Sequence, residues 1–144
     1  MPERQDPLWI SDIKEAIARV EEYTEGISYA EFLEDRKTQD AVVRNIGIMG
    51  EAAKKISPEF KRRHKGIDWK AIAGTRDKVV HDYFGVNWSI LWDVVKNKLP
   101  QLEAHVRVIE GGEYFGLTLK AAHTVRIARK LIRQDFLMAT SLLA

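Results

Sequence analysis

Apolar residues recur every three or four positions along most of the chain, the spacing that places them on one face of an α-helix. The first such run follows Asp6-Pro7, a pair typical of a helix start, and comprises Ile10, Ile13, Ile17 and Val20. The longest run spans residues 38–56 with alternating steps of four and three, and comprises Val42, Ile46, Met49, Ala53 and Ile56. That rhythm suits packing in an antiparallel bundle.

Helix boundaries are visible between these runs. Gly26 follows the first run and is the residue type that most often ends a helix. Ser28 and Glu31 have the spacing of a capping box, in which each side chain satisfies a backbone N–H at a helix start. The sequence therefore predicts a turn at Gly26 and a short helix after Ser28.

The second half of the chain continues in the same way. Ser57-Pro58 should stop the long helix, and we expect residues 61–66 to form a basic loop. Asp68 and Asn87 are predicted to cap two further helices. Pro100 should kink the last of these rather than end it. That helix has one apolar side, formed by Trp88, Leu91, Val95, Leu99 and Leu102.

The period of two expected of β-strands is not found, and neither are repeats or low-complexity segments. The fold class is therefore predicted to be all-α, an antiparallel helical bundle. We expect one domain over residues 1–110 and an atypical basic amphipathic extension over residues 111–144, with Gly111-Gly112 as a hinge. Residues 114–144 carry five Lys or Arg against one Asp, a charge of +4. The overall charge of +2 leaves −2 for the first 113 residues, too little for general nucleic-acid binding.

Composition narrows the class of protein further. Hydrophobic residues make up 45% of the 144 residues and charged ones 31%, which is typical of a folded globular chain. The lack of cysteine excludes disulfides and thiolate metal sites. No apolar run approaches the ~20 residues needed to span a membrane, and the first six residues lack a signal-peptide core. We therefore expect a soluble cytoplasmic protein without membrane contact.

The chemistry-bearing residues are concentrated in the stretch from Arg76 to Tyr83. Arg76 offers paired donors suited to a phosphate, and His81 can accept and release a proton near neutral pH. Asp77 lies four residues before His81, so on a helix its carboxylate can orient the imidazole. This combination predicts a site that holds or cuts a phosphodiester, although the pattern alone is also typical of a helix histidine bonded to an aspartate.

The spacing of Arg76 and His81 constrains how they could act together. Five residues place two side chains about 140° apart around a straight helix, so they do not share a face. Tyr83, seven residues after Arg76, does share its face. A complete site therefore requires either that the arginine bends round or that a second copy of the helix lies opposite. A two-fold homodimer would supply that copy.

A polar stripe on the long helix offers secondary candidates, Arg44 and Glu51, with Asp40 and Gly47 on the same side. Gly47 costs roughly 1 kcal/mol of helix propensity, and its lack of a side chain would let another helix approach. The stripe is either a second wall of the site, part of a dimer surface, or a solvated face. The sequence leaves these alternatives open.

Two further groups of residues each have a functional and a structural interpretation. The basic run at residues 61–65 could steer RNA, but short charge runs are usually solvated loops. Trp69, Trp88 and Trp92 could stack on bases, but tryptophans at helical spacing beside apolar residues usually belong to the core.

The segments FLEDRKTQDAVVRNIGIMGEAAKKISPEFKRRH and IDWKAIAGTRDKVVHDYFGVNWSILWDVVKNKLPQL resemble the HepT family of the HEPN superfamily. The resemblance covers roughly residues 8–110. Its most specific element is Arg-x4-His-x-Tyr within GTRDKVVHDYFGV. Residues 111–144 match nothing expected of the family.

The resemblance implies a metal-independent RNase, with no cofactor, that acts as the toxin of a type VII-like HEPN/MNT toxin–antitoxin pair. It implies that Arg76 and His81 are catalytic and that Asp77 supports them. It implies that a minimal nucleotidyltransferase (MNT-type) antitoxin silences the toxin by AMPylation of Tyr83. The family's fold is a helical bundle that dimerises, with two motifs in one groove that binds RNA.

The expected reaction uses the RNA 2′-hydroxyl as nucleophile, with His81 moving the proton and Arg76 stabilising the phosphorane. An alternative remains in which the same residues serve a non-catalytic HEPN module. In that case the helix face is only a docking surface and modification substrate for a nucleotidyltransferase.

Overall fold

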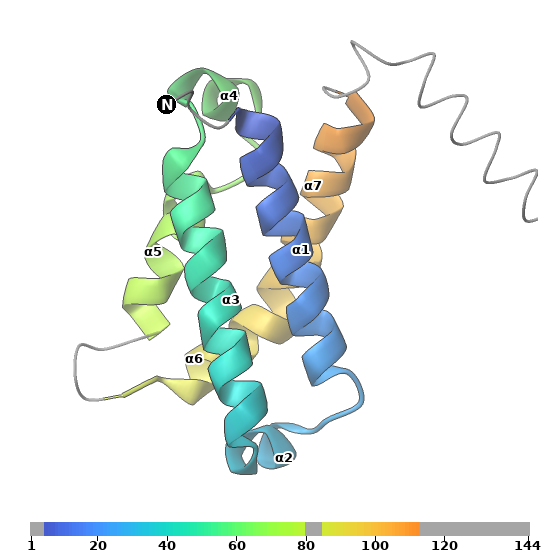
Figure 1. The fold of residues 1–144 in the computed structure, drawn as a ribbon, viewed down its shortest axis with the longest axis vertical. Helices are drawn as coiled ribbons and strands as arrows, with labels where there is room; N and C mark the ends of the chain where they lie inside the picture. The colour runs from blue at the N-terminus through green and yellow to red at the C-terminus, as the bar shows by residue number, and fades with distance from the viewer. Residues whose placement is uncertain (1–4, 80–84, 113–144) are drawn as a thin grey trace, which may run out of the picture. The chain divides into compact units, whose positions relative to one another are not determined.

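The computed structural model describes residues 5–79 and 85–112. The chain divides into two units, Met1–Arg107 and Val108–Ala144, and the division falls within the last described helix. Every regular element in the described residues is helical, which confirms the predicted all-α class (Figure 1). No described helix is long and apolar enough to cross a membrane.

Two long helices and several shorter ones form the first unit. In chain order the elements are α1 (Asp6–Thr24), α2 (Tyr29–Glu34), α3 (Arg36–Lys55), α4 (Pro58–Arg63), α5 (Trp69–Val79), α6 (Trp88–Asp93), the π-helical turn η1 (Val94–Lys98) and α7 (Leu99–Gly112). Figure 1 shows α1, α3 and α5 side by side with alternating direction, and α2 and α4 at opposite ends of α3. The most extensive packing joins α3 to α1 and to α5, so α3 is the central helix.

The apolar runs predicted from the sequence form the core. All four apolar residues of the first run and all five of the α3 run are at most 3% exposed. On the last helix, Leu91, Val95 and Leu99 are buried, whereas Trp88 and Leu102 are half-buried. The periodicity thus identified both the helices and their inward faces, because burial on one side of a helix selects apolar residues there.

The start of α1 differs from the prediction in one respect. Gln5 is the N-cap residue and Asp6 is the first helical residue, so the Asp6 side chain does not cap its own helix. Its two carboxylate oxygens instead accept hydrogen bonds from the backbone N–H (2.8 Å) and the hydroxyl (2.6 Å) of Ser57. Asp6 therefore ties the beginning of α1 to the corner between α3 and α4.

The other predicted helix ends are confirmed. Gly26 has a φ of 71°, which favours glycine, and the capping box of Ser28 and Glu31 is formed. Asp68 accepts from the N–H of Ala71, and Asn87 caps α6. The predicted basic loop at residues 61–66 is wrong in part, because Ser57 caps a further helix and residues 58–63 form α4.

Pro100 lies inside the helical path rather than at its end, as expected. Proline cannot donate to the carbonyl four residues earlier, and its ring crowds that carbonyl in a regular helix. The π-helical turn η1 lies immediately before it, where the N–H of Leu99 donates to the carbonyl of Val94, five residues back. We attribute the wider turn to the accommodation of Pro100.

Aromatic residues close the α2 end of the bundle. Phe32 is fully buried and its ring packs on Trp88 and Trp92, with centroid distances of 5.8 and 5.0 Å. Lys96 lies 4.6 Å from the Trp92 ring centroid and donates to the carbonyl of Thr24 near the end of α1. These two half-buried tryptophans are part of the packing, as the commoner interpretation of their spacing predicted, and Trp69 is buried.

Candidate functional site

The candidate site lies at the C-terminal end of α5. Arg76 and Asp77 are in the last turn of that helix. His81 and Tyr83 lie outside the described residues, so the structure does not test their predicted roles. A hydrogen bond joins the described residues before and after the segment 80–84, because the N–H of Asn87 donates to the carbonyl of Val79 at 2.8 Å. The ends of the segment that contains the motif are therefore fixed to the bundle.

The Arg76 side chain lies against α3. A methyl group placed on Gly47 would be 3.9 Å from Cδ of Arg76, so the arginine stem passes over a position that has no side chain. One guanidinium nitrogen is 3.8 Å from the carboxylate of Asp77, and the two side chains are 58% and 70% exposed. An exposed pair at that distance contributes little and leaves the guanidinium donors accessible to an anion.

Close approach of α3 and α5 brings Arg76 to this position. A methyl group on Gly50 would lie 3.5 and 3.6 Å from the carbonyl oxygens of Ala73 and Ile72. Gly50 faces the middle of α5 and Gly47 faces its C-terminal end, as two antiparallel helices in contact require. Among the described residues, an added Cβ at Gly47 would meet the Arg76 side chain and no backbone atom within 4 Å, so the close helix approach predicted there is not found; the nearer backbone contacts are at Gly50, which the prediction missed. The Gly-x-x-Gly spacing on one side of α3 could have indicated it.

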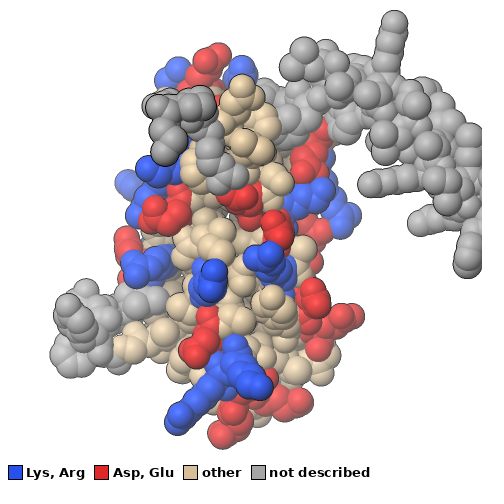
Figure 2. Space-filling model, viewed as in Figure 1, with Lys and Arg blue, Asp and Glu red and all other residues tan. Residues whose placement is uncertain are grey.

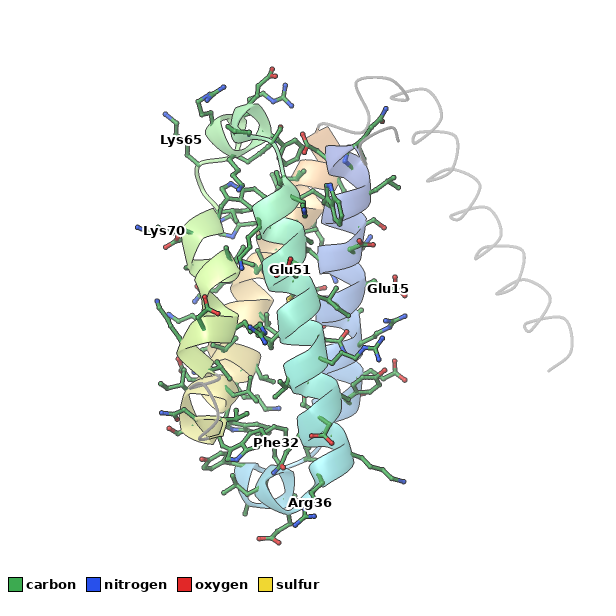
Figure 3. The ribbon with its side chains drawn as sticks, turned by 60° about the vertical axis from the view of Figure 1, so that its left-hand side comes forward. Glu15, Phe32, Arg36, Glu51, Lys65 and Lys70 are labelled. Atoms are coloured by element: carbon green, nitrogen blue, oxygen red, sulfur yellow. The ribbon has the colours of Figure 1, made fainter. Side chains whose placement is uncertain are left out.

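The secondary candidates lie on the exposed side of α3. Arg44 and Glu51 are both exposed, one helical turn before and after Gly47. Glu51 pairs with Lys54 at 3.6 Å, where both side chains are more than half exposed (Figure 3). The structure thus places Arg76 beside Gly47, between the positions of Arg44 and Glu51 along α3, and the role of these two residues as a second wall of the site stays a prediction.

A cavity of about 490 Å³ lies on the other side of α5, between that helix, α3 and the α6–α7 path. Apolar residues such as Met49 and Ile72 form much of its lining, with Lys78 and Lys98 among its polar members. Of the candidates Arg76, Asp77, Arg44 and Glu51, none lines it. The described candidate residues are therefore not part of this cavity.

Charge on the surface of the bundle is mixed. Figure 2 shows acidic and basic side chains interspersed over the face viewed there. Among the described residues, no group of three or more His, Cys, Asp or Glu side chains is placed to hold a metal ion. The described part of the site is thus an exposed arginine supported by a glycine on a neighbouring helix and next to a carboxylate.

Comparison with known proteins identifies the class to which this site belongs. The sequence profile described as ribonuclease HepT-like matches residues 13–109, which include α3, α5 and all four candidate site residues that the structure describes. The chain therefore belongs to the HepT-like ribonuclease family.

Individual relatives agree with this assignment. A protein of Thermococcus cleftensis named as a ribonuclease HepT is 47% identical over 95 residues, which cover 66% of this chain and 86% of the relative. A protein of Methanocaldococcus jannaschii named as an RNase is 37% identical over 115 residues, covering 77% of this chain and 95% of the relative. A protein of Caldanaerobacter subterraneus subsp. tengcongensis, also named as an RNase, is 43% identical over 88 residues, covering 61% and 79%. No solved structure matches this chain.

Proposed function

We propose that this protein is a metal-independent endoribonuclease in which Arg76 binds the scissile phosphate and His81 transfers the proton. The observation that carries the proposal is the position of Arg76. Its stem lies over Gly47, and its guanidinium is exposed, with the carboxylate of Asp77 3.8 Å away as its ion-pair neighbour within the part of the chain that the structure describes. An arginine held in this way can meet a phosphate without first breaking a buried ion pair.

The proposed reaction is an internal transesterification of RNA. The 2′-hydroxyl loses its proton to His81 and attacks the adjacent phosphorus, and the bond from phosphorus to the 5′-oxygen breaks. The leaving 5′-oxygen takes up a proton, so the products are a 2′,3′-cyclic phosphate and a 5′-hydroxyl. Positioned acid–base groups contribute about 10²–10⁴-fold to such a step. Arg76 stabilises the extra negative charge on the phosphorane.

Cleavage of RNA in EDTA tests the catalytic assignment. Purified wild-type protein should cut RNA, and Arg76→Ala and His81→Ala should each reduce the rate at least about 10²-fold while the far-UV circular dichroism of a helical protein is kept. Arg44→Ala, on the adjacent stripe, tests whether α3 forms a second wall. Wild-type cleavage by His81→Ala would refute the mechanism. A protein that never cuts RNA would leave the non-catalytic module as the better description.

We extend the proposal to a homodimer in which each site combines Arg76 of one chain with His81 of the other. The five-residue spacing supports this, because on a straight helix such a spacing would place two side chains about 140° apart. Mixing and refolding inactive Arg76→Ala and His81→Ala chains should restore about a quarter of the wild-type activity, since half the dimers would be mixed and each would hold one intact site. No recovery would refute the shared site.

The biological role that we propose is that of the toxin in a type VII-like HEPN/MNT toxin–antitoxin pair. The antitoxin would be an MNT-type nucleotidyltransferase that adds AMP to Tyr83, in the same motif as Arg76 and His81. The added phosphate could pair with Arg76 and occupy the cation that RNA needs. Intact-mass measurement after incubation with the nucleotidyltransferase, ATP and Mg²⁺ tests this. Tyr83→Phe should gain no mass and should remain an active RNase, so a mass gain in that variant would exclude Tyr83.

A further inference from the structure

Positive charge is concentrated at the α4 end of the bundle. Residues 54–70 contain seven Lys or Arg against two Asp or Glu, a net charge of +5. The other described residues of the first unit, 5–53, 71–79 and 85–107, carry ten Lys or Arg against fourteen Asp or Glu, a net charge of −4. Figure 3 shows Lys65 and Lys70 at this end and Arg36 at the opposite end. The bundle is therefore an acidic body with one basic end, which we call the basic end and define as residues 54–70.

The basic end is a packed structure rather than an extended loop. Phe60 and Ile67 are buried, and the indole of Trp69 donates to the carbonyl of His64 at 3.0 Å. The ring of Phe60 packs on those of His64 and Trp69, at centroid distances of 4.6 and 6.1 Å. The link from Asp6 to the α3–α4 corner holds the same end from the other side. The cations consequently project from a platform with a fixed position relative to α5.

The exposed surface of this end is almost entirely polar. Of the large hydrophobic residues that are exposed in the first unit, none falls within residues 54–70. A docking surface for a folded protein would be expected to present aromatic or aliphatic residues at its centre. Nucleic-acid interfaces are more polar and much more positively charged. The composition therefore fits a polyanion better than a protein partner.

The basic end also lies less than two helical turns from Arg76 along α5, with Lys70 and Arg76 about 120° apart around that helix. Lys70 is six residues before Arg76 on α5, about 9 Å along the helix axis. Lys54 is seven residues after Gly47 on α3, at the matching level of the antiparallel pair. Phosphates of one strand are separated by about 3.4 Å along a nucleic-acid duplex, so a distance of this size covers only a few nucleotides. One RNA strand can therefore contact the basic end and Arg76 at once.

From this arrangement we infer that the basic end is a second RNA-binding site, which holds the strand a few nucleotides away from the phosphate that Arg76 engages. The inference rests on the proposed RNase function. The role of the basic end is to bind RNA and not to take part in the chemical step. The acidic remainder of the bundle repels RNA, and the positive charge of the basic end offsets that repulsion. A long RNA should bind more tightly because it contacts both the basic end and Arg76, whereas a dinucleotide is too short to reach both.

A matched pair of charge reversals in the full-length chain tests the inference. Arg62→Glu/Lys65→Glu alters two exposed cations of the basic end, and Arg36→Glu/Lys37→Glu makes the same change in charge at the opposite end. The basic segment beyond residue 113 is present in both variants and cancels from the comparison. Binding of a 20-nucleotide single-stranded RNA with 2′-deoxy substitutions, which cannot be cut, is measured between 50 and 200 mM salt.

The basic-end variant should bind this RNA about tenfold more weakly at 50 mM salt, and its salt slope should fall by about 1.4, since each lost phosphate contact on a single strand removes about 0.7. The control variant should resemble the wild type. In cleavage assays the basic-end variant should show a raised KM for the cleavable 20-mer with kcat unchanged. Its kcat/KM for a dinucleotide should be that of the wild type.

Equal affinity and equal salt slope in the two variants would overturn the inference. So would normal RNA binding by the basic-end variant together with loss of its complex with the nucleotidyltransferase, which would assign the surface to a protein partner. A third outcome separates the two proposals. If the wild type binds the uncleavable RNA through the basic end but does not cleave a natural RNA, the proposed RNase function fails and the RNA-binding site stands.

Discussion

The contact between Gly47 and Arg76 allows a test of the site that does not alter any proposed catalytic residue. A methyl group at Gly47 would lie 3.9 Å from Cδ of Arg76, which is an ordinary van der Waals distance. Gly47→Ala should therefore leave Arg76 in place and stabilise α3 by about 1 kcal/mol through its higher helix propensity. Gly47→Leu adds three more carbon atoms in the path of the arginine stem.

The leucine variant should lose activity without losing its fold. Because the Arg76 side chain is 58% exposed, it has room to move aside, so the strain on the bundle is small. A guanidinium displaced by an ångström or more should lower kcat/KM for RNA cleavage by about 10²-fold. The assay pairs cleavage of a fluorescent RNA with thermal unfolding followed by circular dichroism.

A matched control is available on α5. At Gly74 an added Cβ would have no neighbour within 4 Å, so Gly74→Leu adds the same bulk to α5 at a position that starts in open space. It should retain most of the cleavage activity. If Gly47→Leu remains folded and cuts RNA at the wild-type rate, the position of Arg76 over α3 is not the one in which it acts.

Two further predictions concern stability. Asp6→Ala removes both hydrogen bonds to Ser57 and should lower the free energy of unfolding by about 3 kcal/mol or more in urea titrations, since each bond to a charged group contributes about 1.5–3 kcal/mol. A loss as small as that of Glu15→Ala, which breaks only an exposed pair on α1, would refute the role assigned to Asp6. The pKa of Glu21 is raised above its ordinary value of 4.5, chiefly by burial and then by a hydrogen bond to Glu103 and repulsion from it. The folded state therefore binds this proton more tightly, so ionised Glu21 costs stability at pH above 4.5 and the cost disappears as the pH falls. Glu21→Gln should raise the Tm at pH 7 and have less effect at pH 4, and a larger gain at pH 4 than at pH 7 would contradict the sign.

Much of the candidate site was accessible from the sequence. Arg76, Asp77, Gly47 and the exposed stripe on α3 were identified from residue chemistry and helical spacing, and the structure brings Arg76 to Gly47. The proposed pairing of Arg76 with His81 stays a prediction, as do the roles of Tyr83, the homodimer and the nucleotidyltransferase partner. The assignment of residues 111–144 as a separate extension is also a prediction.

The sequence by itself determined the helices, their buried faces and most of their caps, because these depend on interactions between residues three or four positions apart. The apolar run of α3 and the capping box at Ser28 are of this kind. The tertiary structure decided which distant residues meet. The Asp6 carboxylate can accept hydrogen bonds from the first turn of its own helix or from Ser57, 51 residues away. The antiparallel packing of α1 on α3 brings Ser57 to it and so selects the second partner. In the same way, the packing of buried Phe60 on Trp69 holds α4 against the bundle, and Arg76 meets Gly47 because α5 packs antiparallel on α3.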